Sequence, residues 1–478
     1  MTHAILTLLL AIAPAITAPA ETALPVLKTT RSVVSIREGE TLHRDSWRLS
    51  PQASPDLYEV EVKAGRPQSV VFITDVDSMR FTVEVGTHYD FIIQHGGDRC
   101  LTRIAGIVVP PAAVFDAEYR SRHSGVISIE VPEVYELVNI ALAMTDTGIH
   151  DRNLVYHDSE YYAAMRTWFD PFSTHPAIAA LDSALRLATG LYFDLKMNGY
   201  SFELDHGDRL VHSRIYDRTA YPGERSNALR PFIGLLESFA RDSRFREFYR
   251  QHQAVYSEQI AFYRDTAHVG AMRAWLNRNF PAVKAYDSYK ILFSPLVAYN
   301  QSATWLESNG FKELQAHVNY PYPRDVDRFS RGATLSAQAA TILRGDIVFT
   351  ELKHGYITPE ADLFADRVRM ATSRREYWVD PARGPNYYAG ISAFNEYMNW
   401  ALVSLRMTDV APAAEQRTLI ATVDNLMTNS RGFPQFAAFD SFLVDLYRHR
   451  QSGQTVADFY PRIIDWFAAR NAGVSGGR

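Results

Sequence analysis

An early part of the chain alternates apolar and polar positions in the manner of β-strands. Residues 69–74 and 81–85 are rich in β-branched and aromatic side chains, and the second segment alternates with a period of two. Residues 89–94 and 100–104 have the same character and are separated by two glycines, which predicts a hairpin. The pattern therefore predicts a small antiparallel β-domain near the N-terminus.

Beyond Pro132 the spacing of apolar positions becomes that of helices. Residues 133–143 begin with acidic side chains and repeat apolar positions every three or four residues, which indicates the start of a helix. The same spacing returns in residues 177–190, 228–242, 247–263, 269–280, 334–343, 361–373, 391–407, 413–427 and 436–450. Residues 284–298 and 314–318 predict a few strands among these helices. The predicted fold class is α+β, with a small N-terminal antiparallel β-domain followed by a larger, mainly α-helical domain.

The change of pattern sets the predicted domain boundaries. Pro110-Pro111 and the polar residues 119–125 lie between the two patterns. We assign residues 24–125 to the N-terminal β-domain and residues 126–471 to the helical domain. Residues 472–478 are expected to form a flexible tail.

The first residues predict the compartment. Residues 4–16 form an apolar run that small residues follow. This is typical of a signal peptide, here residues 1–23, with cleavage between Thr17 and Leu24. We therefore expect an exported protein, periplasmic or extracellular.

Composition narrows the class of protein. The 478-residue chain is 47% hydrophobic, its formal net charge is −5, and its Lys and Arg residues are scattered. A nucleic-acid binder would carry a basic patch, so no nucleic-acid partner is expected. No later apolar run reaches the roughly 18 residues that a spanning helix needs, so we expect no membrane span in the mature chain. The single cysteine, Cys100, rules out a disulfide within the chain.

Residues 346–359, D-I-V-F-T-E-L-K-H-G-Y-I-T-P, carry the candidate chemistry. On a helix, Glu351 and His354 emerge from one face, with Tyr356 nearby. This is the second half of the zinc-peptidase pattern H-E-x-x-H, in which two His bind the metal and the Glu takes a proton from the metal-bound water. Thr350 occupies the position of the first His, and threonine cannot replace imidazole as a strong zinc ligand.

The same Glu-x-x-His spacing occurs twice more, at Glu40/His43 and at Glu203/His206. The Glu203/His206 pair lies among polar residues and is followed by Gly207, which indicates a turn. We expect both pairs to be exposed to solvent. Spacing alone does not identify a site, so the surroundings of each pair must decide.

A catalytic zinc site needs three protein ligands, and His354 supplies one. Glu396 lies among apolar residues of a predicted helix, where a carboxylate is costly to bury unless a cation satisfies it. His317 is the candidate for the third ligand. Alternatively, Glu351 is itself a ligand, since Glu-x-x-His on one helix is a binding unit in di-metal helical bundles.

These motifs resemble a family of secreted bacterial proteins, the domain of unknown function DUF4932. The resemblance is carried by residues 349–359 and 394–405, and residues 132–137, 146–148 and 294–297 also resemble this family. It would cover residues 132–471. The resemblance implies a peptidase-like domain with kinship to zinc peptidases of the gluzincin type, and it assigns the site to Glu351, His354 and Glu396.

The resulting hypothesis is an exported, metal-dependent hydrolase that cleaves peptide bonds in a peptide or protein substrate. Zinc held by His354, Glu396 and His317 would polarise the scissile carbonyl and lower the pKa of its bound water. Glu351 would take the proton of that water. Tyr356 or a neighbouring tyrosine would stabilise the oxyanion.

Two alternatives stay open. In one, Glu351 and His354 are an ordinary pair on a helix face, and Glu396 is paired with an arginine such as Arg369 or Arg406. In the other, the chain is a non-catalytic exported binding or scaffold protein that retains the helical fold.

Overall fold

The structure is a computed structural model, and it describes residues 24–51, 55–63, 66–221, 224–283, 286–330, 332–384, 387 and 390–473. The chain divides into two compact units, Met1–Pro110 and Pro111–Arg478. The predicted signal peptide lies outside the described residues, and so do residues 474–478 of the predicted tail.

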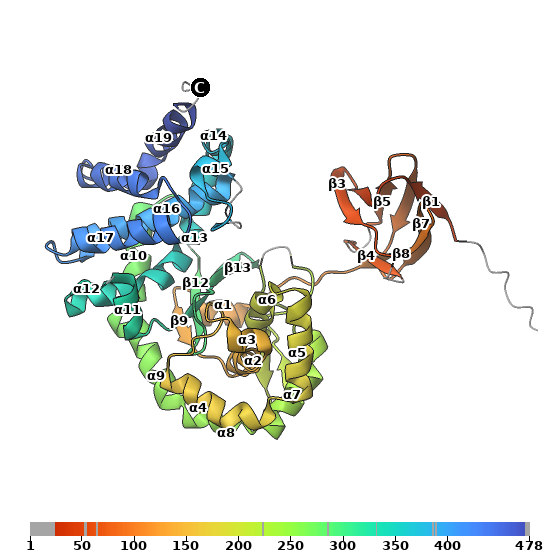
Figure 1. The fold of residues 1–478 in the computed structure, drawn as a ribbon, viewed down its shortest axis with the longest axis horizontal. Helices are drawn as coiled ribbons and strands as arrows, with labels where there is room; N and C mark the ends of the chain where they lie inside the picture. The colour runs from red at the N-terminus through yellow and green to blue at the C-terminus, as the bar shows by residue number, and fades with distance from the viewer. Residues whose placement is uncertain are drawn as a thin grey trace, which may run out of the picture. The chain divides into compact units, whose positions relative to one another are not determined.

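The first unit consists of two four-stranded sheets (Figure 1). One has the strand order β1-β7-β8-β4 and the other β3-β2-β5-β6. The strands are β1 (Val26–Thr29), β2 (Val33–Glu38), β3 (Thr41–Arg48), β4 (Asp56–Glu61), β5 (Gln68–Ile73), β6 (Ser78–Val83), β7 (His88–His95) and β8 (Asp98–Ile107). The β7–β8 pair is the predicted hairpin, and Gly96 in its turn has the positive φ of 57° that favours glycine.

Strand pairing in the first unit is only partly antiparallel. The pairs β1–β7 and β4–β8 run parallel, so the predicted antiparallel domain contains one mixed sheet. Both sheets contribute apolar side chains to a common core, among them Ile36, Phe72, Phe91 and Ile104. The alternation of buried and exposed positions that marked these strands in the sequence arises from this core.

The second unit is built on a four-stranded sheet with the order β13-β14-β12-β9. Its strands are β9 (Ile127–Glu130), β12 (Ser288–Ser294), β13 (Ser302–Ser308) and β14 (Phe311–Asn319). Strand β12 pairs in parallel with β9 and β14, whereas β13 at the edge pairs antiparallel with β14. A small antiparallel hairpin, β10 (Phe202–Leu204) and β11 (Leu210–His212), lies apart from this sheet.

The helices of the second unit account for most of its residues. The helices that precede strand β12 in the chain are α1 (Ala117–His123), α2 (Glu133–Ala143), α3 (Asp146–His150), α4 (Glu160–Phe169), α5 (Pro176–Leu187), α6 (Leu191–Asn198), α7 (Ile233–Asp242), α8 (Phe245–Gln251), α9 (Gln253–Ala261) and α10 (Val269–Asn279). After it come α11 (Pro323–Ser330), α12 (Ala337–Arg344), α13 (Asp346–Asp362), α14 (Ala365–Ala371), α15 (Arg375–Trp378), α16 (Gly390–Val410), α17 (Gln416–Asn425), α18 (Phe436–Arg448) and α19 (Tyr460–Ala472). This organisation confirms the predicted α+β class.

The division between the units lies earlier than the predicted boundary at residue 125. Helix α1, which the sequence placed with the β-domain, belongs to the second unit. Its Tyr119 is buried and donates a hydrogen bond of 2.5 Å to Glu313 on β14. The polar residues on either side of Tyr119 resembled a linker, but they form the exposed face of a short packed helix.

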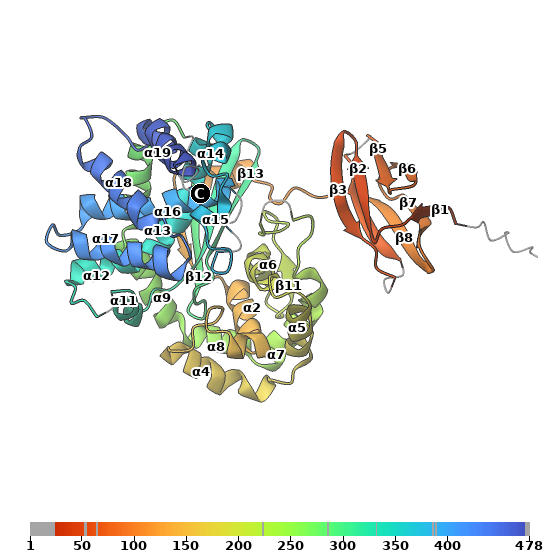
Figure 2. The ribbon, with the colours of Figure 1, turned by 45° about the horizontal axis from the view of Figure 1, so that its top comes forward.

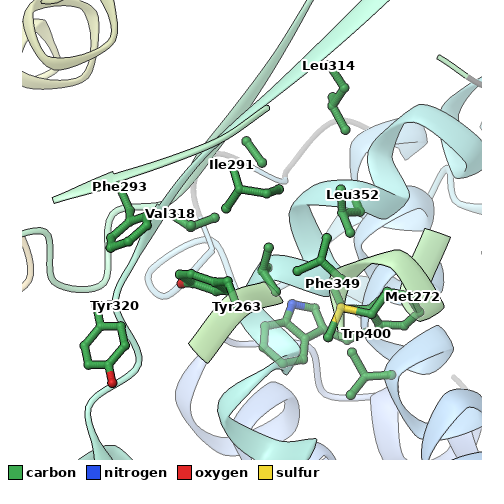
Figure 3. Packing of buried hydrophobic residues seen from close by; sticks show 14 of the residues in the cluster. Tyr263, Met272, Ile291, Phe293, Leu314, Val318, Tyr320, Phe349, Leu352 and Trp400 are labelled. Carbon is green, nitrogen blue, oxygen red and sulfur yellow. The ribbon is translucent and has the colours of Figure 1, made fainter. Parts of the chain in front are cut away.

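Helix α13 lies against the central sheet and against α16 (Figure 2). Phe349 and Leu352 of α13 pack in the same core as Ile291, Leu314 and Val318 of the sheet (Figure 3). This face of α13 is mostly apolar, and the fully buried Lys353 lies beside it with its ammonium 4.4 Å from the ring centroid of Phe349. None of the helices in the described residues is long and apolar enough to cross a membrane.

Candidate functional site

A cavity of about 450 Å³ lies between α13, α16 and the edge strand β13. Helix α13 lines it with Thr350, Glu351, His354 and Thr358. Successive positions are separated by one, three and four residues, so helical geometry places them on one face. The predicted pair Glu351/His354 therefore opens into a cavity, with Thr350 beside it.

Gly355 lets α13 approach its neighbours closely. A Cβ atom at this position would lie 1.9 Å from Cε2 of Tyr286, which is far inside a van der Waals contact. Tyr286 belongs to the segment that leads into β12. The glycine that follows His354 therefore brings the Glu-x-x-His turn against the sheet.

Glu396 on α16 is buried at the cavity and is paired with Arg431. The guanidinium Nη2 of Arg431 lies 2.6 Å from Oε1 of Glu396, and the indole Nε1 of Trp400 donates to the same oxygen at 2.9 Å. Trp400 lies one helical turn after Glu396. The cation that satisfies this buried carboxylate is thus an arginine, although neither Arg369 nor Arg406 that the sequence suggested.

Arg431 is also held by aromatic side chains. Its Nη2 donates to Oη of Tyr387 at 3.0 Å, and its guanidinium carbon lies 5.2 Å from the ring centroid of Trp400. The charge of Glu396 and burial raise the pKa of Tyr387 to about 12. Tyr387 therefore keeps its proton at neutral pH and can donate a hydrogen bond.

Glu351 and His354 have fewer partners in this cavity. Oγ1 of Thr350 donates to Oε1 of Glu351 at 3.2 Å. Nδ2 of Asn399 lies 3.4 Å from Nε2 of His354. Burial, with a contribution from the charge of Glu396, raises the pKa of the Glu351 carboxyl. A buried carboxyl of this kind is suited to exchange a proton or to receive a cationic group.

Strand β13 and aromatic side chains form the remaining wall. Ser302, Ala303 and Trp305 of β13 line the cavity, together with Phe193 and Tyr221. Trp305 and Tyr221 are 37% and 40% exposed, so their rings are open to a ligand. The cavity thus places carboxylates and a guanidinium opposite an apolar, aromatic surface.

His317 does not reach this site. It lies on β14, where Leu314 and Val318 face α13 (Figure 3). Successive side chains of a strand point to opposite faces, so His317 points away from α13. Its ring lies 5.6 Å from that of Tyr135 on α2, centroid to centroid, and burial lowers its pKa well below the ordinary value. The prediction of His317 as the third metal ligand is therefore wrong.

Tyr356 does not line the cavity either. Its Oη donates to Oδ1 of Asn277 at 2.7 Å and lies 2.7 Å from Oη of Tyr289. The side chain is buried in the core between α10 and β12. The tyrosines that line the cavity are Tyr221, Tyr299 and Tyr387.

The metal-binding capacity of the site can be tested against its donor atoms. Among the residues that the structure describes, no group of three His, Cys, Asp or Glu side chains is placed to hold a metal ion. Thr350 stands where an imidazole would bind, and Glu396 already accepts from Arg431. A divalent ion at Glu396 would lie beside the guanidinium, which would repel it. The residues therefore do not fit a zinc ion in this arrangement.

Sequence reasoning missed Arg431, Tyr387, Asn399 and Trp400. Asn399 and Trp400 follow Glu396 at three and four residues on one helix, so the helical spacing was a usable signal. Arg431 follows the π-helical turn Leu426–Ser430, far from any motif, and no pattern in the sequence connects it to Glu396.

No protein-family model, curated protein or solved structure matches the chain. The resemblance to DUF4932 therefore stays a prediction, and the cavity itself is the basis on which a function can be proposed.

Proposed function

We propose that the second unit is a binding protein with a peptidase-like site, which holds an extended peptide segment in the cavity beside β13 without cleaving it. The ion pair between Glu396 and Arg431 is the observation that carries this proposal. It supplies the positive charge that the buried carboxylate requires, at the place where a peptidase of this kind would use a metal. Arg431 thus supplies the positive charge that a metal would supply there, but an arginine cannot act as a Lewis acid.

The edge of the sheet supports a peptide as the ligand. In the described part of the chain β13 pairs with β14 alone, so its other edge can accept a further strand. An extended peptide that adds to such an edge gains main-chain hydrogen bonds, while pockets beside the strand select its side chains. Trp305, Tyr221 and Phe193 provide apolar surface for those side chains.

The experiment measures binding and cleavage of the same peptides. Full-length protein is incubated with an immobilised library of random decapeptides, and retained peptides are identified and titrated. Replacing Trp305 or Tyr221 by Ala should weaken binding by about tenfold, the loss of ~1.4 kcal/mol expected for a contact aromatic. Leu187→Ala is the control, because Leu187 is 90% exposed and does not line the cavity. If the control lowers binding equally, the peptide does not occupy this cavity.

A second candidate is the metal-dependent hydrolase, with zinc as the tentative cofactor and a peptide or protein as substrate. The observation in its favour is that Glu351, His354 and Glu396, predicted from separate motifs, line one cavity. This alternative requires the Arg431 guanidinium to leave Glu396, because His354 and Glu396 do not fit a zinc ion while that ion pair is in place.

Zinc content and peptide cleavage separate the two candidates. A wild-type chain that carries about one zinc and loses casein hydrolysis on chelation would establish the hydrolase and overturn the binding proposal. The binding proposal expects no zinc and no cleavage in the wild type. Thr350→His restores the full H-E-x-x-H pattern on this helix face and should raise zinc affinity, whereas Thr350→Gln, of similar bulk, should not.

We also propose that the protein acts outside the cytoplasm. The support is the apolar run of residues 4–16 with the small residues that follow it. N-terminal sequencing of secreted material should find a mature terminus between Thr17 and Leu24. An intact Met1 on secreted protein would contradict this proposal.

A further inference from the structure

The charged side chains that line the cavity beside β13 do not balance. Among the described residues, the carboxylates are Glu351 and Glu396 and the permanent cation is Arg431. Nη2 of Arg431 lies 2.6 Å from Oε1 of Glu396, so these two charges offset each other. The carboxylate of Glu351 is left as an excess negative charge, and it is buried, where a charge is costly without a partner.

Glu351 has no cationic partner in the part of the chain that the structure describes. The hydroxyl of Thr350 donates to its carboxylate at 3.2 Å, and no lysine or arginine of that part forms an ion pair with it. Lys196 is fully buried, and its ammonium donates to the carbonyl oxygen and to Oδ1 of Asn300, at 2.7 and 2.6 Å. The ammonium of Lys196 is therefore held by Asn300 and not by Glu351.

His354 does not supply the missing charge either. Nδ2 of Asn399 lies 3.4 Å from Nε2 of His354, and an amide nitrogen only donates, so Nε2 accepts there and the imidazole is uncharged. Oδ1 of the same amide is buried and has no hydrogen-bond partner among the described residues, although Asn399 lines the cavity. Buried polar atoms rarely lack a partner. The Glu351 carboxylate and this amide oxygen are thus two acceptors that a ligand can satisfy.

The aromatic wall of the cavity suits the body of a basic side chain. Trp305 and Tyr221 line the cavity with rings that are partly exposed. Lysine and arginine pack their hydrocarbon stems along apolar surface, and their charged ends are attracted to the faces of aromatic rings. An acidic side chain would meet the like charge of Glu351 instead.

We propose that the cavity takes a basic side chain of the bound peptide, lysine or arginine, with its charged end at Glu351 and Oδ1 of Asn399 and its stem along Trp305 and Tyr221. This inference rests on the proposed peptide binding and names what that binding selects. An ammonium or a guanidinium carries several donors, enough for a carboxylate and an amide oxygen together. In a peptide that adds to the edge of β13, every second side chain points to the same face, so one residue can enter the cavity while the main chain pairs with the strand.

Selection from a peptide library tests this preference without a known ligand. Full-length wild-type protein is offered immobilised random decapeptides with acetylated amino ends and amidated carboxyl ends, so that positive charge comes from side chains alone. Retained peptides should contain lysine or arginine several-fold more often than the input. A retained lysine peptide should bind about tenfold more tightly than its norleucine counterpart, which keeps the hydrocarbon stem and lacks the ammonium.

Glu351→Gln assigns the preference to this carboxylate. The amide keeps the size of the side chain and removes its charge. The variant should therefore bind the lysine peptide about tenfold more weakly than the wild type does, and the norleucine peptide equally well. Glu203→Gln changes an exposed carboxylate outside the cavity and should keep the preference. The comparison of the two peptides on the wild-type protein decides the question if Glu351→Gln does not fold.

The outcomes separate this inference from the peptide binding on which it rests. Peptides that are retained through Trp305 and Tyr221 without enrichment in basic residues would overturn the inference alone, because Glu351 would then hold a proton. Retention that requires a free amino terminus would overturn it too, since the cation would be the terminal ammonium. If no peptide is retained, or if Trp305→Ala leaves retention unchanged, peptide binding at the cavity fails and the inference fails with it.

Discussion

Glu351 and His354 on α13 have the same spacing as Glu203 and His206 at the β10–β11 hairpin, but their surroundings differ at every level. The first pair lies on a helix whose opposite face is packed against the sheet, and it opens into a cavity. Glu203 lies on the short strand β10 and His206 in the turn after it, and both are exposed. Glu40 and His43 are exposed on the first unit in the same way.

This difference shows what gives a pair of residues its chemistry. The Glu351 carboxyl has its pKa raised by burial and by the charge of Glu396, so its protonation depends on the site around it. At the hairpin, the neighbouring Asp205 and Arg209 form an exposed ion pair at 2.7 Å that solvent screens. A motif acquires a function through the elements that enclose it, and these elements are distant in the sequence.

The largest effect that separates the two regions is expected at their arginines. Arg431→Leu leaves the buried Glu396 carboxylate without its cation and should lower the free energy of unfolding by ~3 kcal/mol. Arg209→Leu, beside His206, removes a pair that is 75% exposed on the arginine side and should lower the free energy of unfolding far less, because solvent screens this pair. Urea unfolding of both variants measures the contrast. Equal losses would mean that the cavity pair is no more buried in solution than the hairpin pair.

Strand alternation explains the wrong position given to His317. All but one of the residues of β14 are buried, because helices cover one face of the sheet and α1, α2 and nearby loops cover the other. The strand does alternate, with Glu313, Gln315, His317 and Asn319 on one face and Leu314, Ala316 and Val318 on the other, but this alternation does not tell which face is turned toward α13. Glu396 was predictable for another reason, since an acid within an apolar helical stretch requires a partner.

The helices and strands could be predicted from local periods in the sequence, but the pairing of Arg431 with Glu396 in the site could not. Periods of two and of three to four residues distinguished strands from helices over most of the described chain. Arg431 reaches Glu396 only because a π-helical turn ends α17 at the right place. The partner of a buried charge depends on such tertiary placement, which no local period encodes.

A second, smaller effect concerns Tyr356, which the sequence assigned to catalysis. Tyr356→Phe removes a hydrogen bond to Asn277 and a contact with Tyr289 in the core, which should cost about 1 kcal/mol of unfolding free energy. Peptide binding should not change, since Tyr356 does not line the cavity. Calorimetry and a peptide titration measure the two properties. A variant of normal stability that no longer binds or cleaves peptide would return Tyr356 to the site.

The pH dependence of stability provides a third contrast. A carboxyl whose pKa is raised on folding binds its proton more tightly in the folded state, so its contribution is greatest below 4.5 and is lost as pH rises through the folded pKa. Glu351→Gln removes this loss. The unfolding free energy of the variant relative to the wild type should therefore increase between pH 4.5 and pH 8.

The matched substitution for this pH experiment is Glu203→Gln, at an exposed position. Its difference from the wild type should stay nearly constant over the same range. If Glu351→Gln also gives a constant difference, the carboxyl is solvated and the cavity is more open than the structure has it.

The smallest effect is expected from the hairpin pair itself. His206→Ala removes an exposed imidazole from a turn that Asp205 holds through hydrogen bonds from the backbone of Gly207 and Arg209. Because those bonds do not involve His206, stability should change by less than ~0.5 kcal/mol and peptide binding should be unaffected. His354→Ala, in contrast, changes the wall of the cavity and should alter peptide affinity. Titrating one peptide against both variants completes the comparison, and an equal response would mean that the Glu-x-x-His spacing has no function at either place.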